Sequence, residues 1–280
     1  MTITLNSNTI GLNISRYLNA TNSRLNKSLE RLSTGSRLNR AGDGAAQIMV
    51  AENMTSQIRG YDAGTSNAQQ GLSMLQTADS ALQQVNEHLQ NIRELAVQAA
   101  NGTNSSAQYA AFEDSLTAEL AAITSITSGT SFGDFALLDG SISGGAAFNI
   151  QAGPNTGDSV DIKAAFSNNT TGASGLNITQ TTLASAANAT TLLGQIDSAI
   201  GTVAGNLASI GGYQNRMINR MDYNSIAKTN VSASLSSIRD TDVAFESANL
   251  ARLQILQQAG AYAFAQANTF PSIALSLLGR

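Results

Sequence analysis

Residues 192–238 read LLGQIDSAIGTVAGNLASIGGYQNRMINRMDYNSIAKTNVSASLSSI. Apolar side chains recur along this segment in steps of four and three, which is the spacing of a coiled-coil face. One row comprises Ile196, Val203, Ile210, Met217, Asn224, Val231 and Ile238, and the other comprises Ile200, Leu207, Gln214, Met221, Lys228 and Leu235. No proline interrupts the pattern, which therefore predicts one helix of roughly 70 Å at about 1.5 Å per residue. Such a helix needs an equally long partner to bury its seam.

Three polar residues, Gln214, Asn224 and Lys228, interrupt this seam. Polar residues at seam positions lower stability, but they fix the register of the helices or permit alternative packings. We hypothesise that they adjust packing between copies of the chain. On this hypothesis, replacing Asn224 with Leu is expected to raise the stability of the monomer and to alter its assembly.

The segment 71–100 supplies the predicted partner, because it carries its own heptad rows of apolar residues. After a polar turn over 101–106, a third helix is predicted over 107–126, and three long helices with short turns form a rod-like bundle. Upstream, Gly60 and Gly64 are expected to loosen the helix that begins near residue 45. We assign to the seam within the rod Leu75, Leu82, Val85, Leu89, Ile92, Ile196, Val203, Ile210, Met217, Met221, Val231, Leu235 and Ile238.

Both ends of the chain also have helical patterns. A helix is predicted over 8–34, with a stop at Ser33-Thr34-Gly35-Ser36 and an irregular loop over 41–46. A last helix follows the polar break over 237–242 and is expected to stop at Phe270-Pro271. The chain is therefore predicted to go out along a rod and return, which places its termini together. Apolar residues that await a partner at these ends are Ile10, Ile14, Leu18, Leu25, Leu29, Leu32, Leu250, Leu253, Leu256, Ala259, Ala263, Leu275 and Leu278.

The middle of the chain, from Ser125 to Thr191, is rich in Ser, Thr, Gly, Asn and Ala. Short alternating runs at 147–150 and 159–162 predict brief strands and hairpins. Few large apolar side chains occur in 167–191, which predicts a surface loop or small excursion. This region could carry O-linked sugars or be a plain solvated loop, and the two interpretations have equal weight. The predicted fold class is thus mainly α, a long-helix coiled-coil bundle with paired terminal helices and a small β-hairpin region.

Composition limits the function. Charged residues make up 12% of the 280 residues, aromatic residues 5%, and the net charge is −4, which excludes a generally basic nucleic-acid binder. The first sixty residues are locally basic, and a solvated or subunit-facing helix surface explains this better than an arm for membranes or nucleic acid. There is no Cys, no signal-peptide pattern at Met1, and no run of eighteen apolar residues. By these rules the chain is expected in the cytoplasm unless another export route exists.

No catalytic motif is present. His88 is the one histidine, so a His-pair metal site is excluded, and its place on a helix favours a solvated surface residue. Asp43 stands between two glycines but lacks the neighbouring carboxylates that Ca²⁺ needs. The acids Asp240 and Asp242 have a simpler role as charges near a helix N-terminus. The sequence therefore predicts a structural protein with no enzyme activity, no cofactor and no metal.

Three motifs in the right order resemble bacterial flagellin. They are ERLSTGSRLN at 30–39, LQNIRELAVQAANGTN at 89–104, and ARLQILQQAG at 251–260, which is followed by AQAN at 265–268 and LSLL at 275–278. The resemblance covers roughly residues 1–140 and 190–280. It implies a subunit that assembles into the helical flagellar filament for swimming motility after export through the flagellar type III channel. The nearest alternative is a hook–filament junction protein, against which the motif at 251–260 argues; an inserted protease would need zinc-binding histidines that 125–191 lacks.

The resemblance also implies a domain division and a set of partners. Residues 1–42 and 241–280 would form an inner filament core, 43–140 and 190–240 an outer helical rod with a small β-region, and 141–189 a short variable surface segment. The partners implied are further copies of the chain, the hook-associated junction and cap proteins, and an export chaperone at the C-terminal helix, with neither nucleic acid nor membrane insertion. The location implied is extracellular, in the filament.

A vertebrate Toll-like flagellin receptor is a further implied partner. Flagellins that this receptor detects share the segment around Arg93 and Leu95, and this chain has both residues. It departs from them at Asn91, where those flagellins often carry Arg, and at Ser115, where they carry Glu. Receptor contact at Arg93 and Leu95 is therefore an expectation that binding to the isolated monomer would test.

Overall fold

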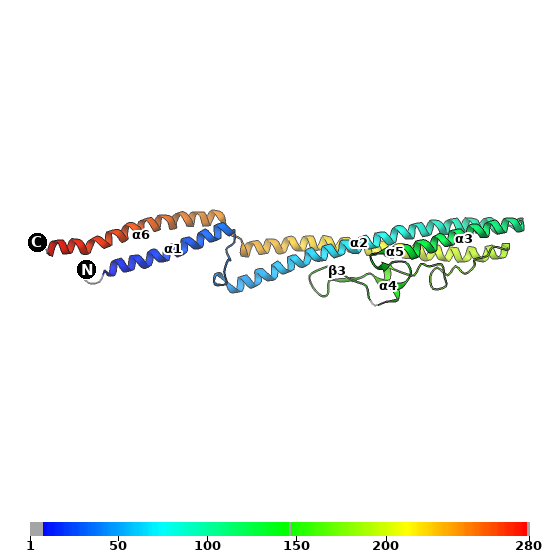
Figure 1. Ribbon diagram of the computed structural model, residues 1–280, viewed down its shortest axis with the longest axis horizontal. Coiled ribbons are helices and arrows are strands. Elements are labelled where there is room, and N and C mark those ends of the chain that lie inside the picture. The colour runs from blue at the N-terminus through cyan, green and yellow to red at the C-terminus, as the bar shows by residue number, and fades with distance from the viewer. Residues whose placement is uncertain (1–7, 146, 279–280) are drawn as a thin grey trace. The chain divides into compact units, whose positions relative to one another are not determined.

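The computed structural model describes residues 8–145 and 147–278, with side chains as far as Thr269. Within these residues the chain is mainly helical, with two small antiparallel hairpins in the middle, so the predicted fold class is confirmed (Figure 1). The α-helices are α1 (Thr9–Thr34), α2 (Ala45–Ala99), α3 (Ser106–Gly129), α4 (Ser141–Gly144), α5 (Ala186–Arg239) and α6 (Val243–Leu278). The strands are β1 (Ser131–Phe132), β2 (Phe135–Ala136), β3 (Asn149–Gln151) and β4 (Ser159–Asp161), and the 3₁₀ turns are η1 (Ala41–Asp43) and η2 (Lys163–Ala165).

The chain divides into two compact units. The terminal unit comprises the described parts of Met1–Ser56 and Asn230–Arg280, and the central unit comprises the described parts of Gln57–Thr229. The first therefore holds α1, α6 and the adjoining ends of α2 and α5. The second holds α3, both hairpins and most of α2 and α5.

The core of the central unit is the seam predicted from residues 192–238. On α5, Ile196, Val203, Ile210 and Met217 are fully buried, because a four-three spacing keeps them on one face of the helix. The same cluster contains Leu116 and Ile123 of α3 and the predicted seam residues of α2: Leu75, Leu82, Val85, Leu89 and Ile92. Met221 is half-buried against it. Val231, Leu235 and Ile238, which the sequence assigns to the same seam, lie instead in the terminal unit.

Two hairpins and the extended segment between η2 and α5 cover the central bundle. Strand β1 pairs with β2, and β3 pairs with β4 in the register Ile150↔Val160. The chain from η2 to α5 then runs over the bundle and buries Phe166, Leu176, Ile178 and Leu183. The prediction of a surface loop over 167–191 is therefore wrong for Leu176, Ile178 and Leu183, because a few well-spaced apolar residues are enough to hold a polar segment on a core.

The expectation that Gly60 and Gly64 loosen α2 is also wrong, since the helix is continuous from Ala45 to Ala99. A Cβ added at Gly64 would lie 2.6 Å from the backbone nitrogen of Gly153, and one at Gly60 would lie 2.6 Å from Cβ of Pro154. The glycines therefore form a flat face on which the turn between β3 and β4 rests directly. Close backbone approach, rather than helix breaking, explains them.

In the terminal unit, α1 and α6 lie side by side and antiparallel (Figure 1). The side-chain amide of Gln257 donates to Asn22 Oδ1 at 2.8 Å, and that of Asn8 donates to the Ala267 carbonyl at 3.0 Å. These contacts confirm the prediction that the two ends of the chain come together. Helix α1 ends where the sequence predicts, with Gly35 in the left-handed conformation at φ 67°.

The predicted stop at Phe270-Pro271 is wrong, because α6 continues to Leu278. Proline removes one backbone donor from a helix and crowds the carbonyl four residues earlier. Here that carbonyl, on Ala267, receives the amide of Asn8 from outside the helix. One external donor therefore compensates for the bond that Pro271 cannot make.

Candidate assembly surface

The interface inside the α1–α6 pair combines leucine side chains with small and polar residues. Gly11 and Ser28 on α1 are buried, as are Glu246, Leu253 and Ala267 on α6, and Leu18 and Leu250 are half-buried. Gly260 approaches α1 so closely that an added Cβ would lie 3.2 Å from Leu18 Cδ1. The small residues bury little apolar area, so they add little to the stability of the pair.

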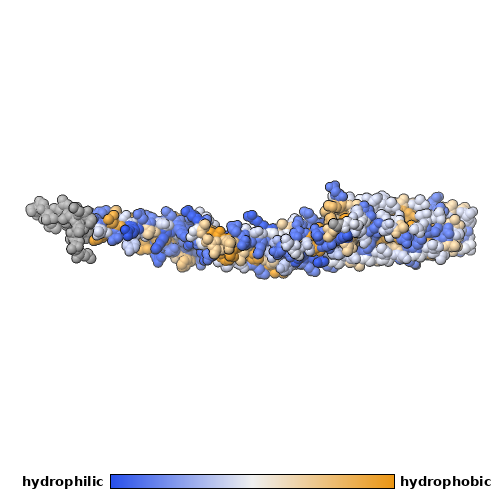
Figure 2. Space-filling model, turned by 90° about the horizontal axis from the view of Figure 1, so that it is seen from below, coloured by the Kyte–Doolittle hydropathy of each residue, from blue (hydrophilic) through white to orange (hydrophobic). Residues whose placement is uncertain are grey.

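Many large apolar residues of the pair lie on its outside. On α6, Ile255 is 66% exposed and Tyr262 is 78% exposed, and α1 has Tyr17 exposed to a similar degree. Other exposed residues of the same kind in this unit are Ile10, Leu12, Leu29, Val243, Phe245 and Leu256. Figure 2 shows apolar residues reaching the surface of the molecule among polar ones. The pair thus leaves its more apolar face unpartnered within one chain.

The predicted assembly residues divide between these two faces. Ile10, Leu29, Leu256, Ala259 and Ala263 are exposed, whereas Ile14, Leu18, Leu25, Leu32 and Leu250 are half-buried and Leu253 is buried. The side chains of Leu275 and Leu278 lie outside the described residues. Four exposed residues that were not predicted from the sequence are Tyr17, Phe245, Ile255 and Tyr262. Tyr17 is seven residues after the predicted Ile10, and Ile255 and Tyr262 are four before and three after the predicted Ala259, so helical spacing could have found them.

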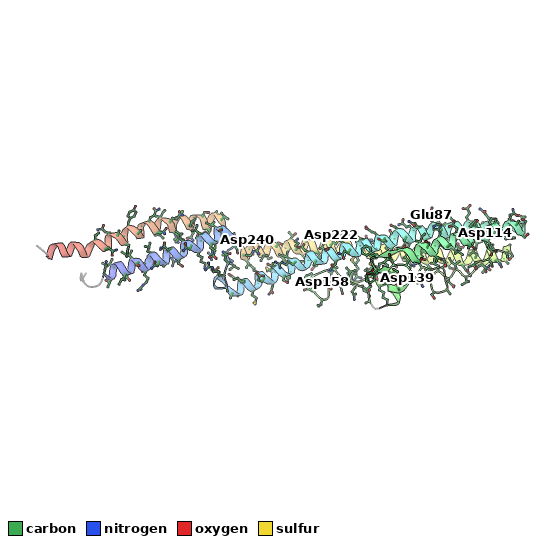
Figure 3. The ribbon with its side chains drawn as sticks, in the orientation of Figure 1. Glu87, Asp114, Asp139, Asp158, Asp222 and Asp240 are labelled. Carbon is green, nitrogen blue, oxygen red and sulfur yellow. The ribbon has the colours of Figure 1, made fainter. Side chains whose placement is uncertain are left out.

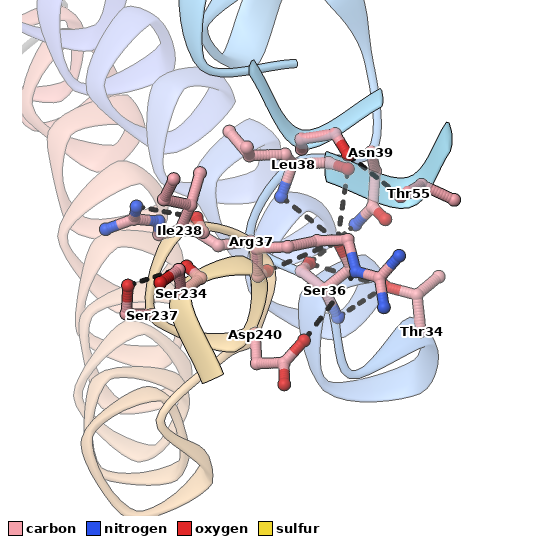
Figure 4. Close-up of polar contacts among 12 residues, drawn as sticks. Thr34, Ser36, Arg37, Leu38, Asn39, Thr55, Ser234, Ser237, Ile238 and Asp240 are labelled. Atoms are coloured by element: carbon pink, nitrogen blue, oxygen red, sulfur yellow. Dashed lines mark hydrogen bonds and ion pairs between the residues drawn. The ribbon is translucent and has the colours of Figure 1, made fainter. Parts of the chain in front are cut away.

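A second site in the terminal unit joins the end of α1 to the end of α5 (Figure 4). Ser36 and Asp240 form an antiparallel bridge, and the Thr241 N–H donates to the Gly35 carbonyl at 2.9 Å. Arg37 donates its backbone N–H to the Arg239 carbonyl at 2.7 Å and its guanidinium Nη2 to the Ile238 carbonyl at 2.8 Å. These carbonyls end α5 and have no donor inside the helix, so Arg37 caps it and complements its dipole.

The carboxylate of Asp43 closes the loop after this bridge. It accepts the backbone N–H groups of Asn39 at 3.2 Å and Arg40 at 3.1 Å, and it lies 2.5 Å from Lys27 Nζ. The bond from Lys27, followed by the backbone bonds, lowers the pKa of Asp43 to about 2. Asp43 therefore fixes a loop, which is a structural use of the aspartate between two glycines.

Most of the basic residues near the N-terminus have partners within the terminal unit. Lys27 pairs with Asp43, Arg40 with Glu30, and Arg31 lies 3.8 Å from the buried carboxylate of Glu246. In the central unit the exposed charges include the acids Glu87, Asp114 and Asp222 (Figure 3). The local basic character thus serves contacts between elements of the unit rather than forming an open cationic surface.

Two polar residues of the α5 seam also act within the chain. Asn224 is 1% exposed, and its amide donates to the Ala152 carbonyl at 2.8 Å and to Thr65 Oγ1 at 3.3 Å. Lys228 Nζ lies 2.6 Å from Asp62 Oδ1. Asn224 therefore holds the β3–β4 hairpin, which gives it a role inside the monomer that the hypothesis of packing between copies did not include.

The remaining sequence-predicted residues lie on α2. Arg93 is exposed and its Nε donates to Asp197 Oδ1 at 2.7 Å, whereas Leu95 is half-buried. Residues two apart on a helix point to different sides, so these two side chains do not form one continuous patch by themselves.

His88 is half-buried, not fully solvated, with Nδ1 2.5 Å from Glu119 Oε2 on α3. His88 is half-buried because its side chain faces α3, which its neighbour Leu89 in the sequence does not indicate.

Within the described part of the chain, no three His, Asp or Glu residues gather in a way that could hold a metal ion. None of the described helices combines the length and apolar character needed to cross a membrane.

A core of long helices, together with a terminal helix pair that leaves large apolar residues exposed, is typical of a structural protein. Comparisons with known proteins agree. A bacterial flagellin N-terminal helical region matches residues 5–143, and a bacterial flagellin C-terminal helical region matches residues 193–278. The chain is 35% identical over 277 residues to a flagellin of Halalkalibacterium halodurans, with 98% of this chain and 99% of that protein covered.

Two further relatives extend the comparison. The flagellar filament 33 kDa core protein of Treponema phagedenis is 34% identical over 289 residues, which covers 98% of this chain and 99% of that protein. The structure of a putative flagellar hook-associated protein from Vibrio parahaemolyticus shares the fold, with a TM-score of 0.54 and 17% identity over 71% of this chain and all of that one. The chain belongs to the bacterial flagellin family. It is a subunit of the flagellar filament, and the junction-protein alternative is not favoured.

Proposed function

We propose that the outer face of the α1–α6 pair is the surface through which copies of the chain polymerise. One observation carries this proposal: although the two helices pack on each other, Tyr17, Ile255 and Tyr262 stay exposed to water. An apolar face of this kind is covered when further copies pack beside it. Because the face on one copy differs from the region it would meet on the next, the contact is heterologous and generates an open helical polymer.

Polymerisation of purified protein tests this proposal. Changing Ile255→Ser and Tyr262→Ser together removes apolar area that only a neighbouring copy would bury, so we expect the critical concentration for seeded growth to rise at least about tenfold. The matched control is Ile226→Ser, which alters an isoleucine of similar exposure on the central unit. Normal growth of the double variant would remove this face from the interface.

We also propose the domain division that the family implies. In this proposal 1–42 and 241–280 form the inner core of the filament, 43–140 and 190–240 form the outer rod, and 141–189 face outward. Electron microscopy of seeded protein should then give long, uniform filaments; short caps alone would favour the junction protein. Intact mass of the natural protein would decide whether Ser and Thr residues in 125–191 carry O-linked sugars.

Export and the other partners belong to the same proposal. The chain would pass through the flagellar type III channel to an extracellular filament, where junction and cap proteins would meet its two ends. Until then the exposed apolar face of α6 needs cover, which favours an export chaperone bound to this helix. Co-purification of the chaperone with the full chain, and its loss on Ile255→Ser with Tyr262→Ser, would test that contact.

Recognition by a vertebrate Toll-like flagellin receptor is a second candidate function. The exposed guanidinium of Arg93 favours it, although Asp197 already binds this group. We expect Arg93→Ala to weaken receptor binding by the monomer, while Arg59→Ala, which alters another exposed arginine of α2, leaves binding unchanged. Equal binding by all three proteins would exclude Arg93 from the contact.

A further inference from the structure

Asn8 stands immediately before α1 and makes two kinds of contact. Its side-chain Oδ1 accepts the backbone N–H of Gly11 at 2.8 Å, which is an N-cap contact. Its side-chain Nδ2 donates to the Ala267 carbonyl at 3.0 Å and also lies 3.3 Å from Asn268 Oδ1. One amide group therefore caps α1 and reaches the backbone of α6.

The carbonyl that Asn8 reaches is the one that Pro271 leaves without its helical donor. In a regular helix the N–H of residue 271 would bind the carbonyl of residue 267, and proline has no N–H. Ala267 is 4% exposed, so water has little access to this site. A buried carbonyl without a donor costs free energy, and Asn8 supplies the missing donor.

Polar contacts add to the register that apolar packing between α1 and α6 provides. Gly11, Ser28 and Gly260 interrupt the leucine side chains of this interface, so at these positions apolar packing specifies the register weakly. Shifting one helix by a turn would move Asn8 about 5.4 Å from the Ala267 carbonyl. The same shift would break the contact between Asn22 and Gln257. These two links are satisfied together in the observed register.

We infer that Asn8 is a positioning residue: it sets the register of the terminal helix pair and allows α6 to continue as a helix through Pro271. Pairing of α1 and helix formation at the end of α6 are thereby coupled through one side chain. The inference deepens the proposed assembly role, because the end of α6 belongs to the part of the chain proposed to form the filament core.

A double-mutant cycle between Asn8 and Pro271 tests this inference. Asn8→Ser keeps an N-cap oxygen but is too short to reach Ala267, whereas Pro271→Ala restores a donor within α6. We expect Asn8→Ser to speed hydrogen exchange near the end of α6 in filaments about fivefold, which corresponds to the loss of one hydrogen bond. In the Pro271→Ala background the same change should have less than about a twofold effect.

Equal effects of Asn8→Ser in both backgrounds, or no effect in either, would overturn the inference, since Asn8 would then act as a cap alone or not at all. If Pro271→Ala does not polymerise, Asn8→Ala provides the comparison. If Asn8 positions α6, Asn8→Ser should lose as much protection from exchange as Asn8→Ala. If Asn8 is only an N-cap, Asn8→Ser should behave as wild type. Failure of the unaltered chain to polymerise would count against the assembly role, and exchange in the full unpolymerised chain would then decide the role of Asn8.

Discussion

Asn224 is a polar residue at a buried seam position of α5, where its side-chain amide makes hydrogen bonds. The Ala152 carbonyl is fully buried in the β3–β4 hairpin, and the amide of Asn224 is its donor at 2.8 Å. Replacing Asn224 with Leu leaves that carbonyl without a donor, so we expect the free energy of unfolding to fall by about 1–3 kcal/mol. This is the opposite of the gain in stability that the seam pattern alone predicts. Urea denaturation measures the change, with Asn215→Leu at an exposed position of the same helix as the control.

Asp43 gives the terminal unit a pH dependence whose direction follows from its pKa. Because Lys27 and two backbone N–H groups hold the pKa near 2 in the folded chain, below the ordinary value of 3.8, the carboxylate stabilises the folded loop above pH 4. That contribution is lost as the pH falls from about 4 through 2. We expect Asp43→Asn to flatten the acid side of a plot of melting temperature against pH. Glu52→Gln, at an exposed acid of the same unit, should leave the plot as in the wild type.

At the scale of elements, the glycine face of α2 sets where the β3–β4 hairpin can lie. Alanine is the better helix former by about 1 kcal/mol, so a glycine without neighbours should gain stability on substitution. Gly201 has nothing within 4 Å of an added Cβ, and Gly201→Ala is expected to stabilise the chain by that amount. At Gly64 the added Cβ would lie 2.6 Å from backbone of the hairpin, so overpacking of about 1–3 kcal/mol outweighs the gain. Urea midpoints that rise for both variants would contradict this account.

Some of these elements could be predicted from the sequence, and others could not. Residues 192–238 were predictable because a strict apolar repeat leaves one way to bury the helix, and the observed α5 contains the whole segment. The glycines at 60 and 64 were not predictable, because their reason is a backbone that approaches from about ninety residues away. The end of α6 was not predictable either. The carbonyl that Pro271 leaves without a helical donor receives the side-chain amide of Asn8, which is far away in the sequence.

The two units of the molecule differ in how completely they bury their apolar side chains. The central unit buries many Leu and Ile side chains and Phe166 completely, whereas the described part of the terminal pair buries one leucine, Leu253, and exposes Tyr262 and Ile255. Stability in such chains is local, and weakly packed elements open first. The family and the central core therefore agree with what the sequence predicts. Which face of the terminal pair is exposed to solvent could not be predicted from the sequence. The apolar periodicity does not show which of two apolar stripes on a helix packs against its partner helix.

This contrast predicts how protection is distributed before and after assembly. In the free subunit we expect amides of α1 and α6 to exchange with solvent quickly, because few apolar contacts oppose their opening. Amides in the buried parts of α2, α3 and α5 should already be protected. In filaments the terminal helices should gain at least about a hundredfold protection, since neighbouring copies then cover Ile255 and Tyr262 and opening requires breaking those contacts. Hydrogen exchange followed by mass spectrometry compares the two states on one protein. Terminal helices as protected in the free subunit as in the filament would mean that the pair is stable alone, and that its apolar face is not what drives its folding.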